Sequence, residues 1–342
     1  MSTHDDTEAE RNRALTEVLE LLADGGLDTS GQWELTQLAG GWSRHTHLLT
    51  ETRGGRGYIV RVKPPAALLD TDLEREYRIY AAAGRAGVAV PAVHALCSTG
   101  DNAFGGPYFV MDQAPGGSPM VWRSRDRAHL EENWRTSRSV AEDILTSLVA
   151  IHDLPVSELS FLGPPLSFTE VVNQWRATYE KNAEVDDPIV DEAFEWVLTR
   201  DPGPCSPSLV HADFRIGNIL LADDRVSAVI DWELAYLGDP LFDLGYAAMP
   251  YYAGKFVRPG SELIGAFAEP EWFVRTYAER RGIEIDPETI RTYTVQGTLQ
   301  LIAIIGIGLR QFAEGENTDP RMAWNRFVVP DLRQDLVRLM GW

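Results

Sequence analysis

The chain has 342 residues, which is enough for one large domain or two smaller ones. Its hydrophobic content of 44% is typical of a globular protein with a sizeable core, and its formal net charge of −20 at pH 7 disfavours nucleic acid or an anionic membrane as partner. The opening MSTHDDTEAERNR does not resemble a secretory signal. The longest apolar run, 301–309, is far shorter than the roughly 20 residues of a membrane-spanning helix.

The two cysteines, Cys97 and Cys205, are distant in sequence and form no C-x-x-C pair. This spacing favours free, buried thiols in a reducing compartment over a disulfide framework. We therefore expect a cytoplasmic protein with no membrane partner, either a monomer or a homodimer.

The N-terminal region, residues 1–28, is expected to begin as an acidic tail and to continue as a helix. From Ala14 onward, four apolar residues recur at helical spacing: Leu15, Val18, Leu19 and Leu22. We expect this helix to pack against the neighbouring domain, because its polar face lacks the basic residues of a membrane-surface helix.

The segment 57–65, GYIVRVKPP, predicts a strand whose side chains alternate between two faces. One face carries Ile59, Arg61 and Lys63, and the other carries Tyr58, Val60 and Val62. The plain structural explanation of a strand arginine is a solvated charge at a sheet edge.

A helix is predicted over 70–86, with Glu76 on its inward face. Glu74 takes that place if the helical register shifts. A surface ion pair with Arg75 or Arg78 is the simpler structural alternative.

Residues 106–117, GPYFVMDQAPGG, predict a strand that runs into a Pro/Gly turn. The chain beyond this turn is mostly helical, with helices predicted over 137–152, 168–182, 271–281 and 287–308. The turn is therefore expected to be the boundary between two lobes.

Two charged groups in the helical part each allow two explanations. Asp186, Asp187, Asp191 and Glu192 form either a solvated acidic surface or a patch that attracts a cationic substrate. Arg310, Arg321 and Arg326 are either ordinary surface charges or a recognition site for an anionic group.

The segment 208–246, SLVHADFRIGNILLADDRVSAVIDWELAYLGDPLFDLGY, carries the densest set of reactive groups. His211, Asp213 and Asn218 follow the spacing His-x-Asp-x-x-x-x-Asn, and Asp231 follows an apolar run. Two apolar runs around the polar turn 222–225 predict a β-hairpin, which brings Asn218 and Asp231 to the same side. Their oxygens suit a hard divalent cation. This metal-and-base arrangement is that of kinase-like phosphoryl transfer, with Asp213 facing the substrate hydroxyl.

Two further acids follow in GDPLFDLG and are expected to support the structure rather than the chemistry. Asp243 precedes an apolar stretch, so we expect it to cap the next helix and to bind backbone amides of the loop, and Asp239 is expected to have a similar structural role. Ala212 stands where protein kinases have arginine, and no long loop follows Asp231. Both features argue against a phosphorylation-regulated protein kinase.

VHADFRIGNIL and VIDWELAYLGDPLFDLGY resemble the signature of the aminoglycoside phosphotransferase and choline kinase-like family. The similarity is greatest to the subgroup of kinase domains attached to some acyl-CoA dehydrogenases. It implies a protein-kinase-like two-lobed fold, ATP or alternatively GTP as nucleotide, and Mg²⁺ held by Asn218 and Asp231. It also implies that Asp213 is the catalytic base and that His211 holds its loop through backbone hydrogen bonds.

The same resemblance assigns the hairpin 37–50, QLAGGWSRHTHLLT, to the nucleotide phosphates. Gly40 and Gly41 allow close approach of the backbone, although a plain hairpin turn explains them as well. Ser43 matches the family's G-x-S-N-x-T-Y pattern, as Thr46 does. Arg44 stands where asparagine is usual, so the family's role for that asparagine is not carried over.

Three further nucleotide-binding assignments follow from the resemblance. Arg61 matches the strand base that holds the nucleotide phosphates, and Glu76 matches the helix glutamate that pairs with this base. Met111, Asp112 and Gln113 match the hinge whose backbone groups meet the adenine ring.

We predict an α+β fold with a tail and helix over 1–28, a sheet-rich N-lobe over 29–113 and a mainly helical C-lobe over 114–342. The predicted activity is ATP- and Mg²⁺-dependent phosphorylation of a small-molecule hydroxyl group. One alternative is a catalytically silent, kinase-like nucleotide-binding protein. Another is a metal-dependent hydrolase built on His211 and Asp213, which would need several more metal ligands. An aminoglycoside and a hydroxyacyl-CoA-like compound both remain candidate acceptors.

Overall fold

The computed structural model describes residues 3–38, 43–65, 67–253 and 262–342. Its contacts divide the chain into two compact units. Unit 1 comprises Met1–Arg85 and Val90–Ala114, and unit 2 comprises Ala86–Ala89 and Pro115–Trp342. A five-stranded sheet lies in unit 1, and most helices lie in unit 2, so the predicted α+β class is confirmed.

The sheet of unit 1 is antiparallel throughout, with strand order β1-β2-β3-β5-β4. Its strands are β1 (Trp33–Gln37), β2 (His45–Glu51), β3 (Gly57–Val62), β4 (Val93–Cys97) and β5 (Tyr108–Asp112). β3 is central, and Arg61 lies opposite Phe109 of β5. A charged side chain on this strand is therefore interior to the sheet rather than at its edge, where a solvated charge would lie.

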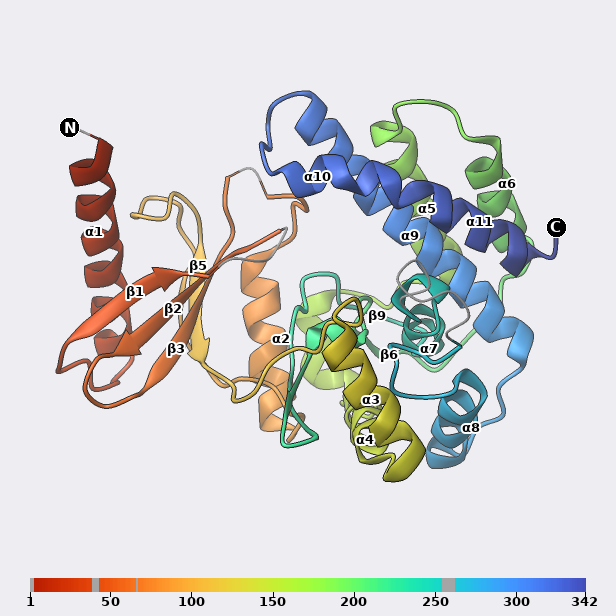
Figure 1. Ribbon diagram of the computed structural model, residues 1–342, viewed down its shortest axis with the longest axis horizontal. Helices are drawn as coiled ribbons and strands as arrows, with labels where there is room; N and C mark the ends of the chain where they lie inside the picture. The colour runs from red at the N-terminus through yellow and green to blue at the C-terminus, as the bar shows by residue number, and fades with distance from the viewer. Residues whose placement is uncertain (1–2, 39–42, 66, 254–261) are drawn as a thin grey trace. The chain divides into compact units, whose positions relative to one another are not determined.

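Helices cover both faces of this sheet (Figure 1). α1 (Thr3–Asp24) places Val18 and Leu22 in one apolar core with Val60 and Val62. α2 (Leu73–Arg85) covers the opposite face, where Tyr80 contacts Phe109 at a centroid distance of 5.8 Å. The predicted alternation of β3 is confirmed, because its valines face α1 while Arg61 faces α2.

The N-terminal helix is longer than predicted, since α1 already begins at Thr3. The expected acidic tail ahead of Ala14 was therefore wrong. Glutamate, alanine and arginine favour helices intrinsically, and Arg13 pairs with Glu17 one turn later at 2.9 Å. Hydrophobic periodicity, on which the prediction rested, does not report such polar helical turns.

Unit 2 is built mainly of helices. These are α3 (Ser124–Thr136), α4 (Ser139–His152), η1 (Val156–Leu162), α5 (Phe168–Asn182), α6 (Pro188–Leu198), η2 (Ile216–Asn218), α7 (Leu241–Ala247), η3 (Pro250–Ala253), α8 (Pro270–Arg281), α9 (Pro287–Ala313), α10 (Pro320–Trp324), η4 (Asn325–Phe327) and α11 (Val329–Met340). Two short strand pairs join them: β6 (Ser208–Val210) with β9 (Tyr236–Gly238), and β7 (Ile219–Ala222) with β8 (Arg225–Val229). The four helices predicted in this part are all present.

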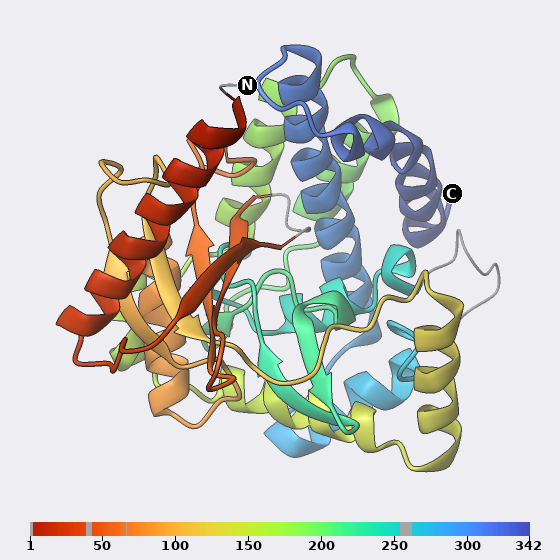
Figure 2. The same ribbon diagram turned by 60° about the vertical axis from the view of Figure 1, so that its left-hand side comes forward.

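α9 is the central helix of unit 2, with α5, α7 and α11 packed around it (Figures 1 and 2). It is long and apolar enough to cross a membrane, but most of its apolar stretch is buried by neighbouring helices, as in the core helix of a globular protein. Its contact with α7 is close: a Cβ on Gly245 would lie 2.4 Å from Cβ of Tyr293. Glycine at 245 therefore allows α7, which carries Asp243, to lie directly against α9.

The β7–β8 hairpin confirms the prediction for residues 219–230. Its two turn residues, Asp223 and Asp224, have φ angles of 50° and 60°. Two consecutive positive φ values are typical of a type I′ turn, whose twist matches that of the flanking strands. The register then pairs Ile219 with Val229 and places the residues before and after the hairpin together.

The cysteines are free, as predicted, but they are not buried. Cys205 is exposed and Cys97 is half-buried. Sequence spacing excludes a disulfide framework, but it carries no information on the burial of either thiol.

Candidate active site

The loop after β6 is organised by His211, which is fully buried in unit 2. Its Nδ1 accepts a hydrogen bond from the backbone N–H of Asp213 at 3.2 Å. Nε2 must therefore carry the proton that it donates to the carbonyl oxygen of Ile230 at 3.0 Å. The predicted structural role of His211 is confirmed: its imidazole ties the loop to the end of the β7–β8 hairpin.

The buried side chain of Asp243 holds the same loop. Its Oδ1 accepts from the N–H of Ala212 at 2.9 Å, and its Oδ2 accepts from the N–H of His211 at 2.8 Å. Oδ2 also lies 3.0 Å from Nε2 of His152, whose Nδ1 contacts the Tyr277 hydroxyl at 2.7 Å. The expected binding of loop amides by Asp243 is confirmed.

The expectation that Asp243 also caps the next helix was wrong. Asp243 lies inside α7, and the N–H of Leu241 instead donates to Oδ1 of Asp239 at 2.9 Å. Oδ2 of Asp239 accepts from the Tyr293 hydroxyl at 2.6 Å, so Asp239 has the structural role expected of it. The helix begins at Leu241, two residues before Asp243.

Ala212 adopts a left-handed backbone conformation, with φ of 66°. This region costs a residue with a Cβ roughly 1–2 kcal/mol. Both polar groups of its backbone are held by buried side chains, the N–H by Asp243 and the carbonyl oxygen by Nε2 of Gln300 at 2.7 Å. The neighbouring elements therefore determine the turn that presents Asp213.

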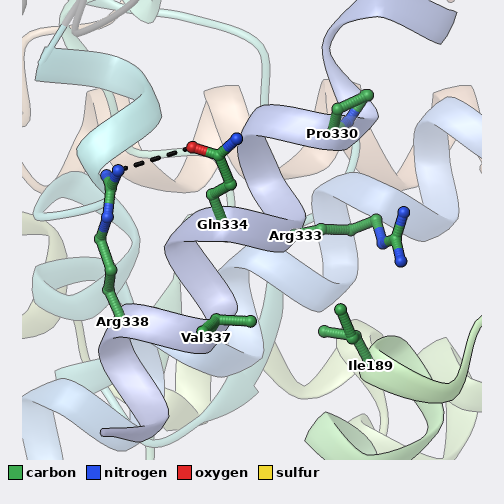
Figure 3. A pocket seen from close by; sticks show the side chains of 6 residues that line it. All are labelled: Ile189, Pro330, Arg333, Gln334, Val337 and Arg338. Carbon is green, nitrogen blue, oxygen red and sulfur yellow. Dashed lines mark hydrogen bonds between the residues drawn. The ribbon is translucent and has the colours of Figure 1, made fainter. Parts of the chain in front are cut away.

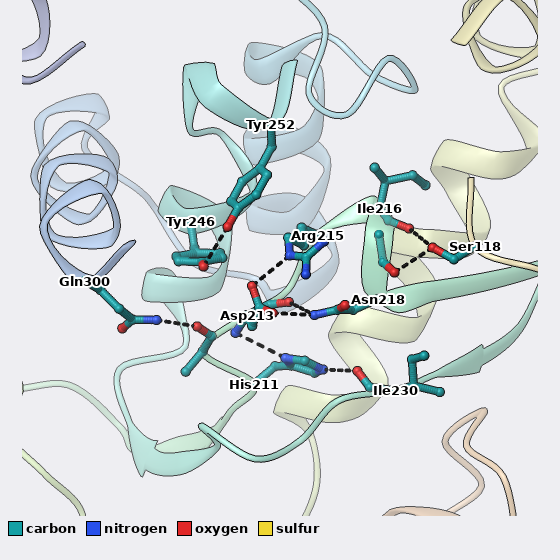
Figure 4. A network of polar contacts seen from close by, with 12 residues as sticks. Ser118, His211, Asp213, Arg215, Ile216, Asn218, Ile230, Tyr246, Tyr252 and Gln300 are labelled. Atoms are coloured by element: carbon teal, nitrogen blue, oxygen red, sulfur yellow. Dashed lines mark hydrogen bonds and ion pairs between the residues drawn. The ribbon is translucent and has the colours of Figure 1, made fainter. Parts of the chain in front are cut away.

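The Asp213 carboxylate is held at both oxygens (Figure 4). Oδ1 accepts from Nε of Arg215 at 2.9 Å, and Oδ2 accepts from Nδ2 of Asn218 at 2.6 Å. Its side chain is 16% exposed, so it is neither buried nor freely mobile. Each oxygen keeps a second lone pair, which leaves the carboxylate able to accept a proton from a correctly placed hydroxyl.

Asn218 and Asp231 have donor atoms that fit a divalent cation. Nδ2 of Asn218 donates to both the carbonyl and Oδ2 of Asp213, at 2.9 and 2.6 Å, which leaves its amide oxygen for a metal. The N–H of Ile230 donates to the Asn218 carbonyl at 2.9 Å, so Asp231 follows directly beside Asn218. One carboxylate and one amide oxygen suit Mg²⁺, which keeps several waters and substrate oxygens as ligands.

No group of three or more His, Cys, Asp or Glu side chains suited to a metal occurs in the part of the chain that the structure describes. Hydrolytic zinc sites need such a set. The hydrolase alternative built on His211 and Asp213 therefore has no supporting ligands among these residues.

Unit 1 contains a buried triad of charged side chains around Glu76. Nη2 of Arg61 lies 3.1 Å from Oε1 of Glu76, and Nε of Arg44 lies 3.4 Å from Oε2. The side chains of Arg44, Arg61 and Glu76 are 1%, 9% and 0% exposed. The structure thus shows Arg61 paired with Glu76, and it places Arg44, whose role was left open, on the second oxygen of the same carboxylate.

Glu76, and not Glu74, takes the inward position on α2. Glu74 is exposed. Lys63 forms an ion pair with Asp70, with Nζ 2.6 Å from Oδ1. Ser43 is buried next to Arg44, while Gly40 and Gly41 lie outside the described residues.

The predicted hinge continues β5, with Met111 buried. The N–H of Asp112 donates to the Ala92 carbonyl at 2.8 Å, and the N–H of Gln113 donates to the Gly57 carbonyl at 3.1 Å. Both donors are therefore engaged inside unit 1. An adenine ring at this stretch could hydrogen-bond only to carbonyl groups or to N–H groups beyond Gln113. The assignment of this segment to adenine stays a prediction.

One acid and all three arginines of the two charged groups in the helical part have structural partners. Asp187 accepts from the N–H of Ile189 at the start of α6, at 3.2 Å. Nη2 of Arg326 lies 2.8 Å from Glu184, and Arg310 and Arg321 form ion pairs with acids close in sequence. These contacts favour ordinary structural or surface roles for Asp187 and for the three arginines.

A pocket of about 370 Å³ lies between α6 and α11 (Figure 3). It is lined by Ile189, Pro330, Arg333, Gln334, Val337 and Arg338. Nε of Arg333 lies 2.8 Å from Oδ2 of Asp187, and Nη1 of Arg338 lies 3.5 Å from Oδ1 of Asp335. None of the predicted site residues lines this pocket.

Among the residues that the structure describes, only Arg215 and Asn218 hydrogen-bond to the Asp213 carboxylate through their side chains. Sequence reasoning missed Arg215. A signal was present, because an arginine two residues after a candidate base lies within reach of it. Arg44 gave a weaker signal as a departure from the family pattern.

The model of the family described as the phosphotransferase enzyme family matches residues 34–283. Among curated proteins, acyl-CoA dehydrogenase family member 10 from Mus musculus is 30% identical over 232 residues, which is 66% of this chain. The match covers 21% of that relative, so the chain spans about a fifth of its length.

Two solved structures share the fold. A protein from Ralstonia eutropha, provisionally assigned as an aminoglycoside phosphotransferase, has a TM-score of 0.72 at 22% identity, covering 95% of this chain and 98% of its own. A thermostable mutant of the aminoglycoside phosphotransferase APH(4)-Ia, in ternary complex with AMP-PNP and hygromycin B, has a TM-score of 0.60 at 19% identity, with the same coverage. The expected protein-kinase-like fold is confirmed. Because the family model spans most of its length, the chain belongs to the phosphotransferase enzyme family.

Proposed function

We propose that this protein is an ATP- and Mg²⁺-dependent phosphotransferase that phosphorylates a hydroxyl group of a small molecule. The observation that carries the proposal is the fixed Asp213 carboxylate, held by Arg215 and Asn218 next to Asp231. A base, a metal-ligand pair and a buried arginine–glutamate pair are the parts that phosphoryl transfer to a hydroxyl requires.

The proposed step is an in-line displacement at phosphorus. The acceptor oxygen forms a bond to the γ-phosphorus, and the bond from that phosphorus to the bridging oxygen of ADP breaks. The hydroxyl proton passes to the Asp213 carboxylate, so the products are a phosphate ester and ADP. Asp213 orients the hydroxyl through the same contact, and its own orientation is set by Asn218 and Arg215.

The remaining roles concern charge. When bound, Mg²⁺ would neutralise phosphate oxygens, with Asn218 and Asp231 as its protein ligands. Arg61 would contact nucleotide phosphates, and Glu76 would hold its guanidinium in place. ATP is the proposed nucleotide, GTP is the alternative, and the cytoplasm is the proposed location.

The comparisons support the class of reaction more than the acceptor. The APH(4)-Ia structure holds a nucleotide analogue and hygromycin B, which makes a polyhydroxylated small molecule one candidate class. The curated dehydrogenase relative makes an acyl-CoA-like hydroxy compound the other. A catalytically silent nucleotide-binding protein would lack a use for the carboxylate that Arg215 and Asn218 orient.

A screen of hydroxyl compounds for ATP consumption tests the proposal, with Mg²⁺ and Zn²⁺ compared. Asp213→Asn should bind Mg-ATP nearly as well as the wild type and lose about 10²-fold or more in kcat. Asp223→Asn, the same substitution in the exposed hairpin turn, is the matched control and should keep full activity. Near wild-type turnover by Asp213→Asn, with chemistry rate-limiting, would refute the assignment of the base. ATP binding without turnover on any compound would favour the silent alternative.

A further inference from the structure

The guanidinium of Arg215 contacts Asp213 through Nε, and its two terminal nitrogens remain able to donate hydrogen bonds to a ligand. Its Nε donates to Oδ1 of Asp213 at 2.9 Å, and its side chain is 26% exposed. The two terminal nitrogens make no hydrogen bond to any residue that the structure describes. Four N–H donors of a cation therefore lie beside the carboxylate that is proposed to accept the hydroxyl proton.

The position of this guanidinium is set by its surroundings (Figure 4). Its Cζ lies 5.4 Å from the centre of the Tyr252 ring, and the Tyr252 hydroxyl is 2.8 Å from that of Tyr246. A Cβ on Gly217 would lie only 2.1 Å from Nη1 of Arg215, so glycine leaves the space that the guanidinium occupies. Burial disfavours its charged form, but the Asp213 carboxylate outweighs this effect and raises the pKa of Arg215 above its usual value.

We propose that Arg215 is a catalytic residue whose terminal nitrogens donate to oxygens of the phosphoryl group during its transfer to the hydroxyl held by Asp213. This inference rests on the proposed function. The attacking oxygen must come within about 3 Å of Asp213, and the phosphoryl oxygens then lie just beyond it. Negative charge on those oxygens in the transition state suits the planar fork of a guanidinium.

A purely positioning role is the competing explanation. In that case Nε would orient Asp213 and the terminal nitrogens would do nothing. A change that displaces only the terminal nitrogens separates the two roles, because it keeps the charge of Arg215. Such a change should lower kcat if these nitrogens contact the phosphoryl group, and it should leave kcat unchanged if Arg215 only positions Asp213. Gly217→Ala is such a change, and no positive φ opposes alanine at this position.

The test uses Mg-ATP, with water or a hydroxyl compound from the screen as acceptor. Arg215→Ala should lower kcat by about 10²-fold or more with little change in KM for ATP, since the contact exists only in the transition state. Millimolar guanidinium ion should restore part of the lost rate. Arg275→Ala, which removes an exposed arginine of α8, is the matched control and should match the wild type.

The double-mutant cycle with Gly217 completes the test. Gly217→Ala alone should lower kcat, and it should change nothing further in the Arg215→Ala background, where no guanidinium is left to displace. Full activity of Arg215→Ala overturns this inference and leaves the proposed function intact. If Arg215→Ala loses activity that guanidinium does not restore, and Gly217→Ala keeps the wild-type kcat, the inference is overturned in favour of a positioning role. A wild type that consumes no ATP with any acceptor overturns the proposed function and this inference together.

Discussion

Arg61 lies in β3 and Lys63 directly follows the end of that strand, yet removing them should have very different effects. Arg61 is 9% exposed and binds a fully buried Glu76 at 3.1 Å. Breaking a buried ion pair by removing one partner costs about 3–5 kcal/mol, because the other charge stays buried. Arg44 remains 3.4 Å from the second oxygen of Glu76, so we expect Arg61→Ala to lose about 3 kcal/mol, the lower end of that range.

Lys63 has an exposed partner. Its Nζ lies 2.6 Å from an Asp70 carboxylate that is 98% exposed. Solvent screens such a pair, which contributes about 0–1 kcal/mol. Lys63→Ala should therefore leave both the unfolding free energy and KM for ATP nearly unchanged.

Urea unfolding and steady-state kinetics on the same variants measure both effects. Arg61→Ala should raise KM for ATP and lower kcat, and Arg61→Lys should recover only part of each, because an ammonium lacks the planar fork. Arg61→Ala and Glu76→Ala should be non-additive in a double-mutant cycle, since they share one contact. A larger loss of kcat and a larger rise of KM for ATP in Lys63→Ala than in Arg61→Ala would refute this assignment of the nucleotide-binding base.

Two further predictions concern the loop around Asp213. Asp231→Ala should nearly abolish Mg²⁺-dependent activity, and unchanged metal dependence would show that Asp231 is no ligand. Asn218→Ala should be milder and partly rescued by excess Mg²⁺, but not fully, because Asn218 also holds Asp213 at 2.6 Å. Asp243→Asn should lower the free energy of unfolding, measured with urea, by about 3 kcal/mol. An amide nitrogen would then face a buried donor such as the N–H of His211. A loss below about 1 kcal/mol would mean that the loop is held by other contacts.

The parts of the fold that were predicted are those with a local physical cause. Alternating valines define β3, and two aspartates between apolar runs define the β7–β8 hairpin. The start of α1 was missed, because a polar helical segment shows no hydrophobic periodicity. The predicted burial of the cysteines was wrong, because burial depends on tertiary packing.

The candidate site likewise contains features that local sequence patterns predict and features that depend on tertiary packing. Periodicity places Glu76 on the inward face of its helix, and the resemblance to the family implies its pairing with Arg61. The position of Arg44 does not follow, since Arg44 precedes β2 and reaches Glu76 by its own side-chain conformation. The engaged N–H groups of Asp112 and Gln113 depend on strand pairing with residues 57 and 92, which periodicity does not specify.

The shape of the catalytic loop is the feature least accessible from its own sequence. Ala212 is held in a left-handed conformation by Asp243 and Gln300, and His152 in turn contacts Asp243. These three side chains come from α4, α7 and α9, so three helices distant in sequence determine one peptide turn. A motif identifies the residues that do the chemistry because their type and spacing are local properties. It does not identify the residues that fix their geometry, because those residues are related to the loop only through the packing of unit 2.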